Sequence, residues 1–317
     1  MAKQSVNLGL MLAKSQSSFG AEIAGLTSVD TIETIGAAKA KIDNGMTPIE
    51  LVSGSFDQDA SIPGITTVEL SWSLYARSAG SDNPGQFGKC CKWSGMVEAE
   101  AVDGTYTYNF TSAQASWTDF SAWLYSGNLD TSGSILRKCY NGIVSPKWIF
   151  SAGKPTVMEC TAKLAYSGIP AAATNPGGVK ERTLPEAFQK ASTLTLNGDS
   201  DYRILSGEID PQQEVTLTTD PVSTYGAGLS VITNRKIKGT FKVYKELPST
   251  LDPETALMGK TISTFAIEYG TVPQKIKFSS SYAQIVSIDP DDENGVETWT
   301  LGVLFERNDF TITVTTK

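Results

Sequence analysis

The sequence predicts a mainly β fold, with two tandem antiparallel β-sandwich units in one chain and a short helix in each unit. Three observations predict it: alternating strands throughout, two helical segments at matching places, and a recurring strand-turn-strand signature. The 317 residues suit two domains of roughly 150 residues each. We expect a first β domain with an N-terminal arm at 1–170, a linker with a short helix at 171–193, and a second β domain at 194–317.

Apolar and polar side chains alternate in every long segment that we read as a strand. In the first half these segments are 68–75 and 158–166, and in the second half they are 237–244, 299–305 and 312–314. Half-buried antiparallel strands need this pattern, because one face meets a core and the other meets solvent. A two-layer sandwich in each half is therefore expected.

Helical signals are few and follow the alternating strands at similar distances. Asn83-Pro84 introduces 85–93, and Asp252-Pro253 introduces 254–260. In both places an Asx residue in the cap region precedes a proline at the first helical turn. A third short helix is expected at 185–191, after the Gly/Pro/Ala-rich linker segment 168–178.

A strand-turn-strand signature occurs once in each half, at 140–151 and at 269–279. Each copy begins with a tyrosine, continues through a glycine and a Val-containing turn with proline, and ends in a lysine and Phe-Ser. Such repetition indicates an internal duplication. Two fused copies of one module can supply a ring with half the number of chains.

Each half also has a long segment of weak periodicity before its alternating strand. These segments are 45–64 and 206–228. Long segments of this kind are uncommon in compact domains and tend to be functional, although an ordinary extended hairpin is the alternative.

The net charge of −8 argues against a protein that grips nucleic acid, which needs a basic footprint. An acidic surface can lie near DNA without binding it. No apolar stretch approaches the roughly 18 residues that span a bilayer, and the apolar run 8–13 is too short and too weakly basic for a signal peptide. We expect a protein made in the cytoplasm, with no membrane contact.

The residues that common enzyme sites require are missing. The chain has no histidine, so Ser-His-Asp triads and the common zinc sites are impossible, and no P-loop or dinucleotide fingerprint occurs. We therefore predict no enzyme, no catalytic residue, no metal and no cofactor. A glycosidase with two carboxylates is the remaining enzymatic alternative. Its candidates, Asp57 with Asp59 or the run 289–293, are more simply read as solvated turn carboxylates.

Three smaller features have structural readings. The acidic run at 289–295 resembles a calcium loop only loosely, and Asn294-Gly295 within it favours a tight hairpin. Cys160 lies on the apolar phase of a strand, which favours a buried, inert thiol. The six tryptophans could build a sugar-binding platform, as in a monomeric carbohydrate-binding or adhesin-like sandwich, but most lie at or beside apolar positions.

A tyrosine-x-glycine turn in the middle of the chain, Tyr140-Asn141-Gly142, leads to a strand that ends in Phe-x-x-Gly-x-Pro, from Phe150 to Pro155, and an alternating strand follows. With these motifs the chain resembles the tail tube proteins of long-tailed, non-contractile (siphovirus-type) bacteriophages. The likeness covers most of the chain. The other segments that carry it are 104–108, 120–126, 137–139, 194–198, 198–225 and 233–236.

The resemblance implies a structural virion protein of the phage tail. Similar proteins pack their sheets side by side into rings around an inner β-barrel, and the rings stack helically into a hollow tube that conducts DNA into the host. A duplicated chain would form trimeric, pseudo-sixfold rings, with hexameric rings as the alternative. The implied partners are further copies of the chain, the tape measure and tail terminator proteins, and DNA that passes through without specific binding.

The resemblance also suggests roles for particular residues. The two long segments would stack one ring on the next, and acidic side chains would line the lumen and repel DNA. The candidates for stacking are Ser53, Gly54, Ser55, Phe56, Asp57, Gln58, Asp59, Thr218, Thr219, Asp220, Pro221 and Tyr225. The candidates for the lumen are Glu69, Glu159, Glu208 and Glu297. The lysines at 236, 238 and 242 should then point outward or form salt bridges.

Overall fold

The fold was analysed in a computed structural model of the whole chain. The structure describes residues 10–16, 23, 25–43, 45, 47–48, 61–62, 64–80, 82–101, 103–127, 134–166, 171–178, 193–196, 202–220, 226–246, 252–306 and 309–317. Strands dominate these residues, and their pairings are antiparallel, so the mainly β prediction is confirmed.

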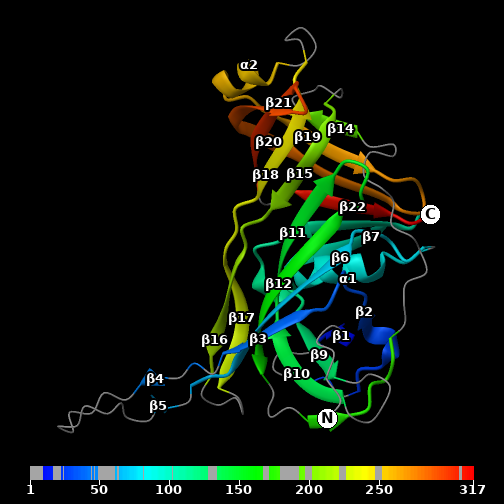
Figure 1. The fold of residues 1–317 in the computed structure, drawn as a ribbon, viewed down its shortest axis with the longest axis vertical. Coiled ribbons are helices and arrows are strands. Elements are labelled where there is room, and N and C mark those ends of the chain that lie inside the picture. The colour runs from blue at the N-terminus through cyan, green and yellow to red at the C-terminus, as the bar shows by residue number, and fades with distance from the viewer. Residues whose placement is uncertain are drawn as a thin grey trace, which may run out of the picture.

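Eight strands from both halves of the chain form one extended antiparallel sheet, which we call the long sheet (Figure 1). Its strands lie in the order β3 (Lys39–Asp43), β6 (Thr67–Tyr75), β12 (Val157–Tyr166), β11 (Val144–Ser151), β15 (Ile204–Asp210), β18 (Lys238–Tyr244), β21 (Val296–Phe305) and β20 (Lys275–Glu293). β3 lies toward one end of the molecule's long axis, and β20 and β21 lie toward the other (Figure 1).

The long sheet is amphipathic, as the alternation in its sequence predicts. Leu70 and Trp72 of β6 are buried, while Glu69 between them is exposed. β12 repeats the pattern with buried Cys160 beside exposed Glu159. One face of the sheet therefore packs on the core and the other carries polar side chains.

A second layer covers the apolar face of the long sheet. It contains β7 (Met96–Ala101), β8 (Thr105–Phe110), β22 (Thr311–Thr315), the first part of β20, β19 (Ile262–Tyr269) and β14 (Thr193–Leu196), paired in that order. β20 joins the layers, because its residues 275–284 pair with β19 or β22 and its residues 283–293 pair with β21.

A smaller group of strands attaches to the end of β12. It comprises β13 (Ala171–Ala173), β10 (Ser134–Gly142), β9 (Phe120–Gly127), β1 (Leu10–Ser15) and the short β2 (Thr31–Ile32). β10 meets β12 through the pair Tyr140 and Ala165. The segment expected to be a linker thus contributes a short strand, because β13 pairs with β10.

The core is shared between the two halves of the chain. Trp148 of β11 is fully buried and packs edge-on against Phe278 of the second half, with ring centroids 5.6 Å apart. The pairings of β11 with β15 and of β8 with β22 also cross between the halves. Both layers and the aromatic cluster between them therefore continue across the middle of the molecule.

The two described α-helices lie where the cap signals predict them. α1 spans Gly85–Trp93, and the Asn83 side chain accepts a hydrogen bond from the amide of Gly85 at 2.8 Å. α2 spans Pro253–Met258, and the Asp252 side chain caps it by accepting from the amide of Thr255 at 2.9 Å. Neither helix is long and apolar enough to cross a membrane. The helix expected at 185–191 lies outside the described residues.

The remaining short helices are 3-10 turns, η1 (Ser28–Asp30) and η2 (Gln114–Ser116). The Asn294-Gly295 hairpin is confirmed, since both residues have positive φ and Glu293 pairs with Val296 across the turn.

The two strand-turn-strand motifs form strands but occupy different places in the sheets. In the first motif β11 lies between β12 and β15, whereas residues 275–279 of the second lie between β19 and β22. Their sequence likeness therefore does not mark structurally equivalent positions, because local composition does not fix which strands become neighbours.

Each long segment of weak periodicity contains a two-stranded hairpin. β4 (Thr47–Pro48) pairs with β5 (Ser61–Ile62) between β3 and β6, and this hairpin projects away from the body of the molecule (Figure 1). β16 (Glu214–Thr219) pairs with β17 (Ala227–Asn234) between β15 and β18. We call these hairpins the first arm and the second arm.

Candidate assembly surface

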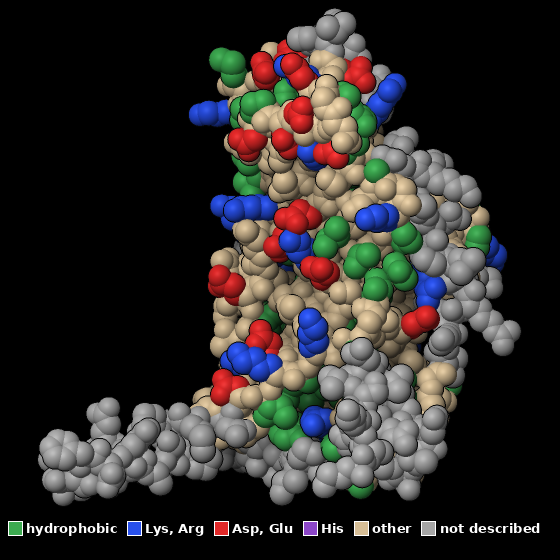
Figure 2. Space-filling model, in the orientation of Figure 1, with side chains coloured by type: hydrophobic (Ala, Val, Ile, Leu, Met, Phe, Trp, Pro, Cys, Tyr) green, Lys and Arg blue, Asp and Glu red, His purple; other side chains and the backbone are tan. Residues whose placement is uncertain are grey.

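The polar face of the long sheet carries charges of both signs. Its described strands place six lysines there, at positions 39, 41, 147, 163, 238 and 242. They also place eight carboxylates there, at positions 43, 69, 159, 208, 210, 289, 291 and 293. Figure 2 shows lysine and arginine interspersed with aspartate and glutamate on the face in view. This face is therefore only slightly acidic.

Strand register sets lysines beside carboxylates across the polar face. Lys41, Glu69 and Lys163 follow one another on β3, β6 and β12. Where β11 meets β15, Lys147 forms an ion pair with Glu208 at 2.6 Å, and this carboxylate raises the pKa of Lys147. Opposite charges on neighbouring strands stabilise this alignment modestly.

The lysines that the sequence places on alternating positions of β18 differ in their surroundings. Lys242 forms ion pairs with Asp291 at 2.9 Å and Glu293 at 2.7 Å, which reach it across β21. These contacts raise the pKa of Lys242 and lower that of Asp291. Lys236 and Lys238 are exposed.

Three of the four acidic candidates for a lumen lie together on the polar face. Glu69, Glu159 and Glu208 occupy β6, β12 and β15 with their side chains on the same side of the sheet. Glu297 belongs to the other face of β21, in phase with the buried Trp299, and pairs with Lys245 at 2.8 Å near the hairpin tip. Sequence alternation alone could not show that Glu297 occupies a different face from the other three, because strand pairing decides which side of a strand faces the core.

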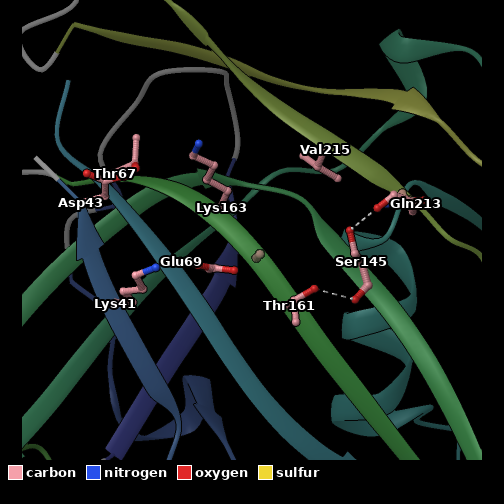
Figure 3. Close-up of a pocket in the computed structure, with 10 residues that line it drawn as sticks. Lys41, Asp43, Thr67, Glu69, Ser145, Thr161, Lys163, Gln213 and Val215 are labelled. Atoms are coloured by element: carbon pink, nitrogen blue, oxygen red, sulfur yellow. Dashed lines mark hydrogen bonds between the residues drawn. The ribbon is translucent and has the colours of Figure 1, made fainter. Parts of the chain in front are cut away.

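A hollow of about 330 Å³ lies on the polar face beside the second arm (Figure 3). Lys41, Glu69 and Lys163 line one side, and Gln213 and Val215 line the other. Its lining is mainly polar and carries both signs of charge, so it resembles a solvated groove more than a ligand pocket.

The stacking candidates are placed only in part. Thr218 and Thr219 belong to β16, and Asp220 follows them, with its amide donating to the carbonyl of Gly226 at 2.8 Å. They lie at the end of β16 that leads into the turn of the second arm. The candidates from Ser53 to Asp59, with Pro221 and Tyr225, lie outside the described residues.

The second arm is anchored on the first half of the chain by a buried polar network that sequence reasoning missed. The side chain of Gln213 donates to the carbonyl of Val144 at 2.8 Å and accepts from Arg235 at 2.8 Å. The Arg235 guanidinium also lies 4.1 Å above the ring of Phe110. A buried arginine beside a strand end is not a local sequence signal, because its partners lie elsewhere in the chain: Gln213 is 22 residues away and Phe110 is in the first half.

Beside this network, Asn141 binds the arm directly. Its side chain donates to the carbonyl of Gly228 at 3.1 Å, and its own carbonyl accepts from the hydroxyl of Ser230. Tyr140 and Ala165 are buried beneath Ala227 of the arm, with Leu217 packed beside them. The second arm is therefore fixed to a neighbouring part of the same sheet.

Both ends of the long sheet have a strand with one partner among the described pairings. β3 pairs with β6 alone, and residues 286–293 of β20 pair with β21 alone. An unpaired strand edge presents free backbone donors and acceptors to another chain.

The chemically reactive groups of the described residues are buried or dispersed. The four cysteines are free and buried, and burial raises the pKa of Cys91, Cys160 and, to about 12, Cys139, which disfavours the thiolate. No three His, Cys, Asp or Glu side chains of the described part of the chain are grouped to hold a metal ion.

The tryptophans form no exposed platform. Trp72, Trp93, Trp148 and Trp299 are buried in the core, and Trp117 and Trp123 are half-buried. Core packing therefore accounts for most of the large aromatic side chains.

Comparison with known proteins adds no assignment. The chain matches no protein-family model, and no curated protein sequence matches it.

Proposed function

We propose that this chain is a structural protein of a phage tail, and that its copies join through the ends of the long sheet into rings that stack as a hollow tube. The observation that carries the proposal is an eight-stranded sheet with one covered face, one polar face and, at each end, a strand with a single partner among the described residues. A sheet of this form is completed when another copy pairs with each edge.

The strand order supports a duplicated unit. β3-β6-β12-β11 and β15-β18-β21-β20 are two four-strand groups with the same connectivity, and an arm follows the first strand of each. Tyr75 and Tyr244 end the corresponding strands β6 and β18, and α1 and α2 follow them. This alignment also makes Tyr140 and Tyr282 equivalent: Tyr140 pairs with Ala165 at the end of β12, and the amide of Glu306, just after β21, donates to the carbonyl of Tyr282.

Within one molecule, β11 pairs with β15 and so joins the first four-strand group to the second. Repeating that contact between copies would continue the sheet into a barrel, with the second layer outside and the polar face inside. Three copies would supply 24 strands, because each long sheet has eight. With a strand spacing of about 4.8 Å and a tilt of about 40°, the barrel would be about 45–50 Å across.

A barrel of this width is wider than a DNA duplex, and its charge suits passage. The mixed polar face with its small excess of carboxylates offers no continuous basic track for phosphates, so DNA would move through without specific binding. The protein would then belong to the virion tail after synthesis in the host cytoplasm. Its partners would be further copies, the tape measure protein and the tail terminator protein.

Removal of residues 53–60 tests the assembly role of the first arm. We expect this variant to be soluble and folded, with wild-type circular dichroism, yet to remain in the supernatant when wild-type tubes are pelleted by ultracentrifugation. Normal tubes from the deletion variant would contradict the stacking role. A matched control removes residues 175–177, an irregular segment outside both arms, and should pellet like the wild type.

A further inference from the structure

We propose that β3 of one copy pairs antiparallel with residues 286–293 of β20 in a second copy, in the register that β15 and β11 use inside the molecule, and that Lys39 and Lys41 there face Asp289. This inference rests on the proposed function and specifies the contact that closes the ring.

The internal junction defines the register. In β11 and β15, Ile149 lies opposite Glu208 and Trp148 lies opposite Ile209. The equivalence of the two four-strand groups maps Ile149 to Asp291 and Glu208 to Lys39. In the same way it maps Trp148 to Pro290 and Ile209 to Ala40, so Pro290 of one copy would lie opposite Ala40 of the next.

The charges at this contact are complementary. At the internal junction Lys147 of β11 pairs with Glu208 of β15 at 2.6 Å. Their equivalents are Asp289 on β20 and Lys39 on β3, so the same ion pair would form with its signs exchanged. Among the described residues, neither Asp289 nor Lys39 has an ion-pair partner, and Lys41 has none.

This arrangement also selects orientation. β3 carries Lys39, Lys41 and Asp43, and the β20 edge carries Asp289, Asp291 and Glu293, of which Asp291 and Glu293 also pair with Lys242. Two β20 edges would place carboxylates opposite one another, which is unfavourable. Head-to-tail pairing instead places the lysines of β3 opposite Asp289, and repeated head-to-tail contacts close into a ring when the rotation from copy to copy completes a full turn.

Apolar exposure at the free edges points to the same partner. Ile204 is buried at the internal junction with 5% exposure, while its equivalent Ile35 beside β3 is 39% exposed. Tyr140 is 3% exposed beneath the second arm, while its equivalent Tyr282 is 51% exposed. The equivalents of side chains that are buried inside the molecule are therefore exposed at the ends of the long sheet, where a second copy would cover them.

An apolar groove of about 390 Å³ runs beside β3 on its core-facing side. Its lining includes Ala38, Ala40, Ile42, Leu10 and Leu124. The occupant we propose is β20 of a second copy, whose Ile288 and Pro290 have the alternation needed to enter the groove while Asp289 stays on the polar face.

Charge reversal tests the contact. The variant Lys41→Glu, and separately Asp289→Lys, should raise the protein concentration needed for ring formation by about tenfold or more, because attraction becomes repulsion at each junction. The combined variant Lys41→Glu/Asp289→Lys restores opposite charges at this pair and should assemble near the wild-type concentration. Light scattering coupled to size exclusion measures the assembled fraction.

The matched control reverses Lys163 and Lys238, two exposed lysines on the central strands β12 and β18, and should leave assembly unchanged. Wild-type assembly of either edge variant, or failure of the combined variant to recover, would overturn the edge pairing while the proposed function stands. A wild-type chain that stays monomeric under all these conditions would instead overturn both.

Cysteine cross-linking tests the register without relying on charge. Ala40→Cys/Pro290→Cys should give disulfide-linked multimers on mild oxidation, since the four native thiols are buried. Ala40→Cys/Ser287→Cys, with the second cysteine on the opposite face of β20, should give few. Equal cross-linking of both pairs would contradict the proposed register.

Discussion

Arg235 shows how one side chain can fix an arm to the body of the molecule. Its guanidinium donates to Gln213 and covers Phe110, and it is 9% exposed. Arg235→Ala should lower the free energy of unfolding by about 2–4 kcal/mol, because Gln213 loses a buried partner and the ring loses its cation.

Urea denaturation of the two proteins checks this expectation. The matched control is Arg203→Ala, which removes an exposed arginine paired with Glu246 at 3.8 Å and should change stability by no more than about 0.5 kcal/mol. Equal effects of the two substitutions would show that the Arg235 network stabilises the fold no more than an exposed ion pair does.

Asp119 gives the fold a pH dependence. Burial raises the pKa of its carboxyl to about 6 in the folded chain, above the value of the unfolded chain. The folded state therefore binds more protons between about pH 4 and 6, and stability falls as pH rises through that window. Asp119→Asn should remove this loss and stabilise the protein at pH 7 by about 1 kcal/mol, after allowance for partial solvent exposure.

Urea midpoints of the wild type and Asp119→Asn, measured from pH 4 to 8, test this point. Their difference should grow up to about pH 6 and then level off. A constant difference across the range would mean that Asp119 titrates normally in the folded state.

At the scale of elements, the turn between β20 and β21 depends on backbone conformation. Gly295 has a φ of +81°, and a Cβ there would contact nothing within 4 Å. Gly295→Val should therefore cost about 1–2 kcal/mol through strain alone. Thermal unfolding measures the loss, and Gly295→Asn, which tolerates positive φ, should recover most of it. Equal stability of the two variants would contradict the strain account.

The elements themselves were largely predictable from the sequence. Strands at 68–75 and 299–305 follow from alternation, and α1 and α2 follow from Asx-proline starts, because these signals act within a few residues. The pairing of β8 with β22, separated by about 200 residues, was not predictable, because alternation fixes the faces of a strand and leaves its neighbours open.

The sequence placed the candidate residues only in part. Glu69, Glu159 and Glu208 share the polar face, while Glu297 belongs to the other face. In the proposed duplication Tyr140 corresponds to Tyr282, a match that the sequence conceals because little else in their neighbourhoods is alike and the irregular register near Ile285 shifts the alignment. The sequence motif at 269–279 instead pairs Tyr140 with Tyr269.

For the whole molecule, the shared core predicts one cooperative unfolding transition. Trp148 of the first half packs against Phe278 and Phe310 of the second, and strands of both halves pair in both layers. Differential scanning calorimetry should show a single peak. Trp148→Ala should lower its midpoint as a whole, with a loss of about 3–5 kcal/mol. Two separated peaks would indicate halves that fold independently.

Copies of this chain should join end to end through the long sheet, and electron microscopy of the purified, concentrated protein would make that assembly visible. We expect hollow rings or stacked tubes whose end views have threefold symmetry and six similar lobes, built from three chains of 33.9 kDa. Uniform compact particles of a single chain at every concentration would contradict it.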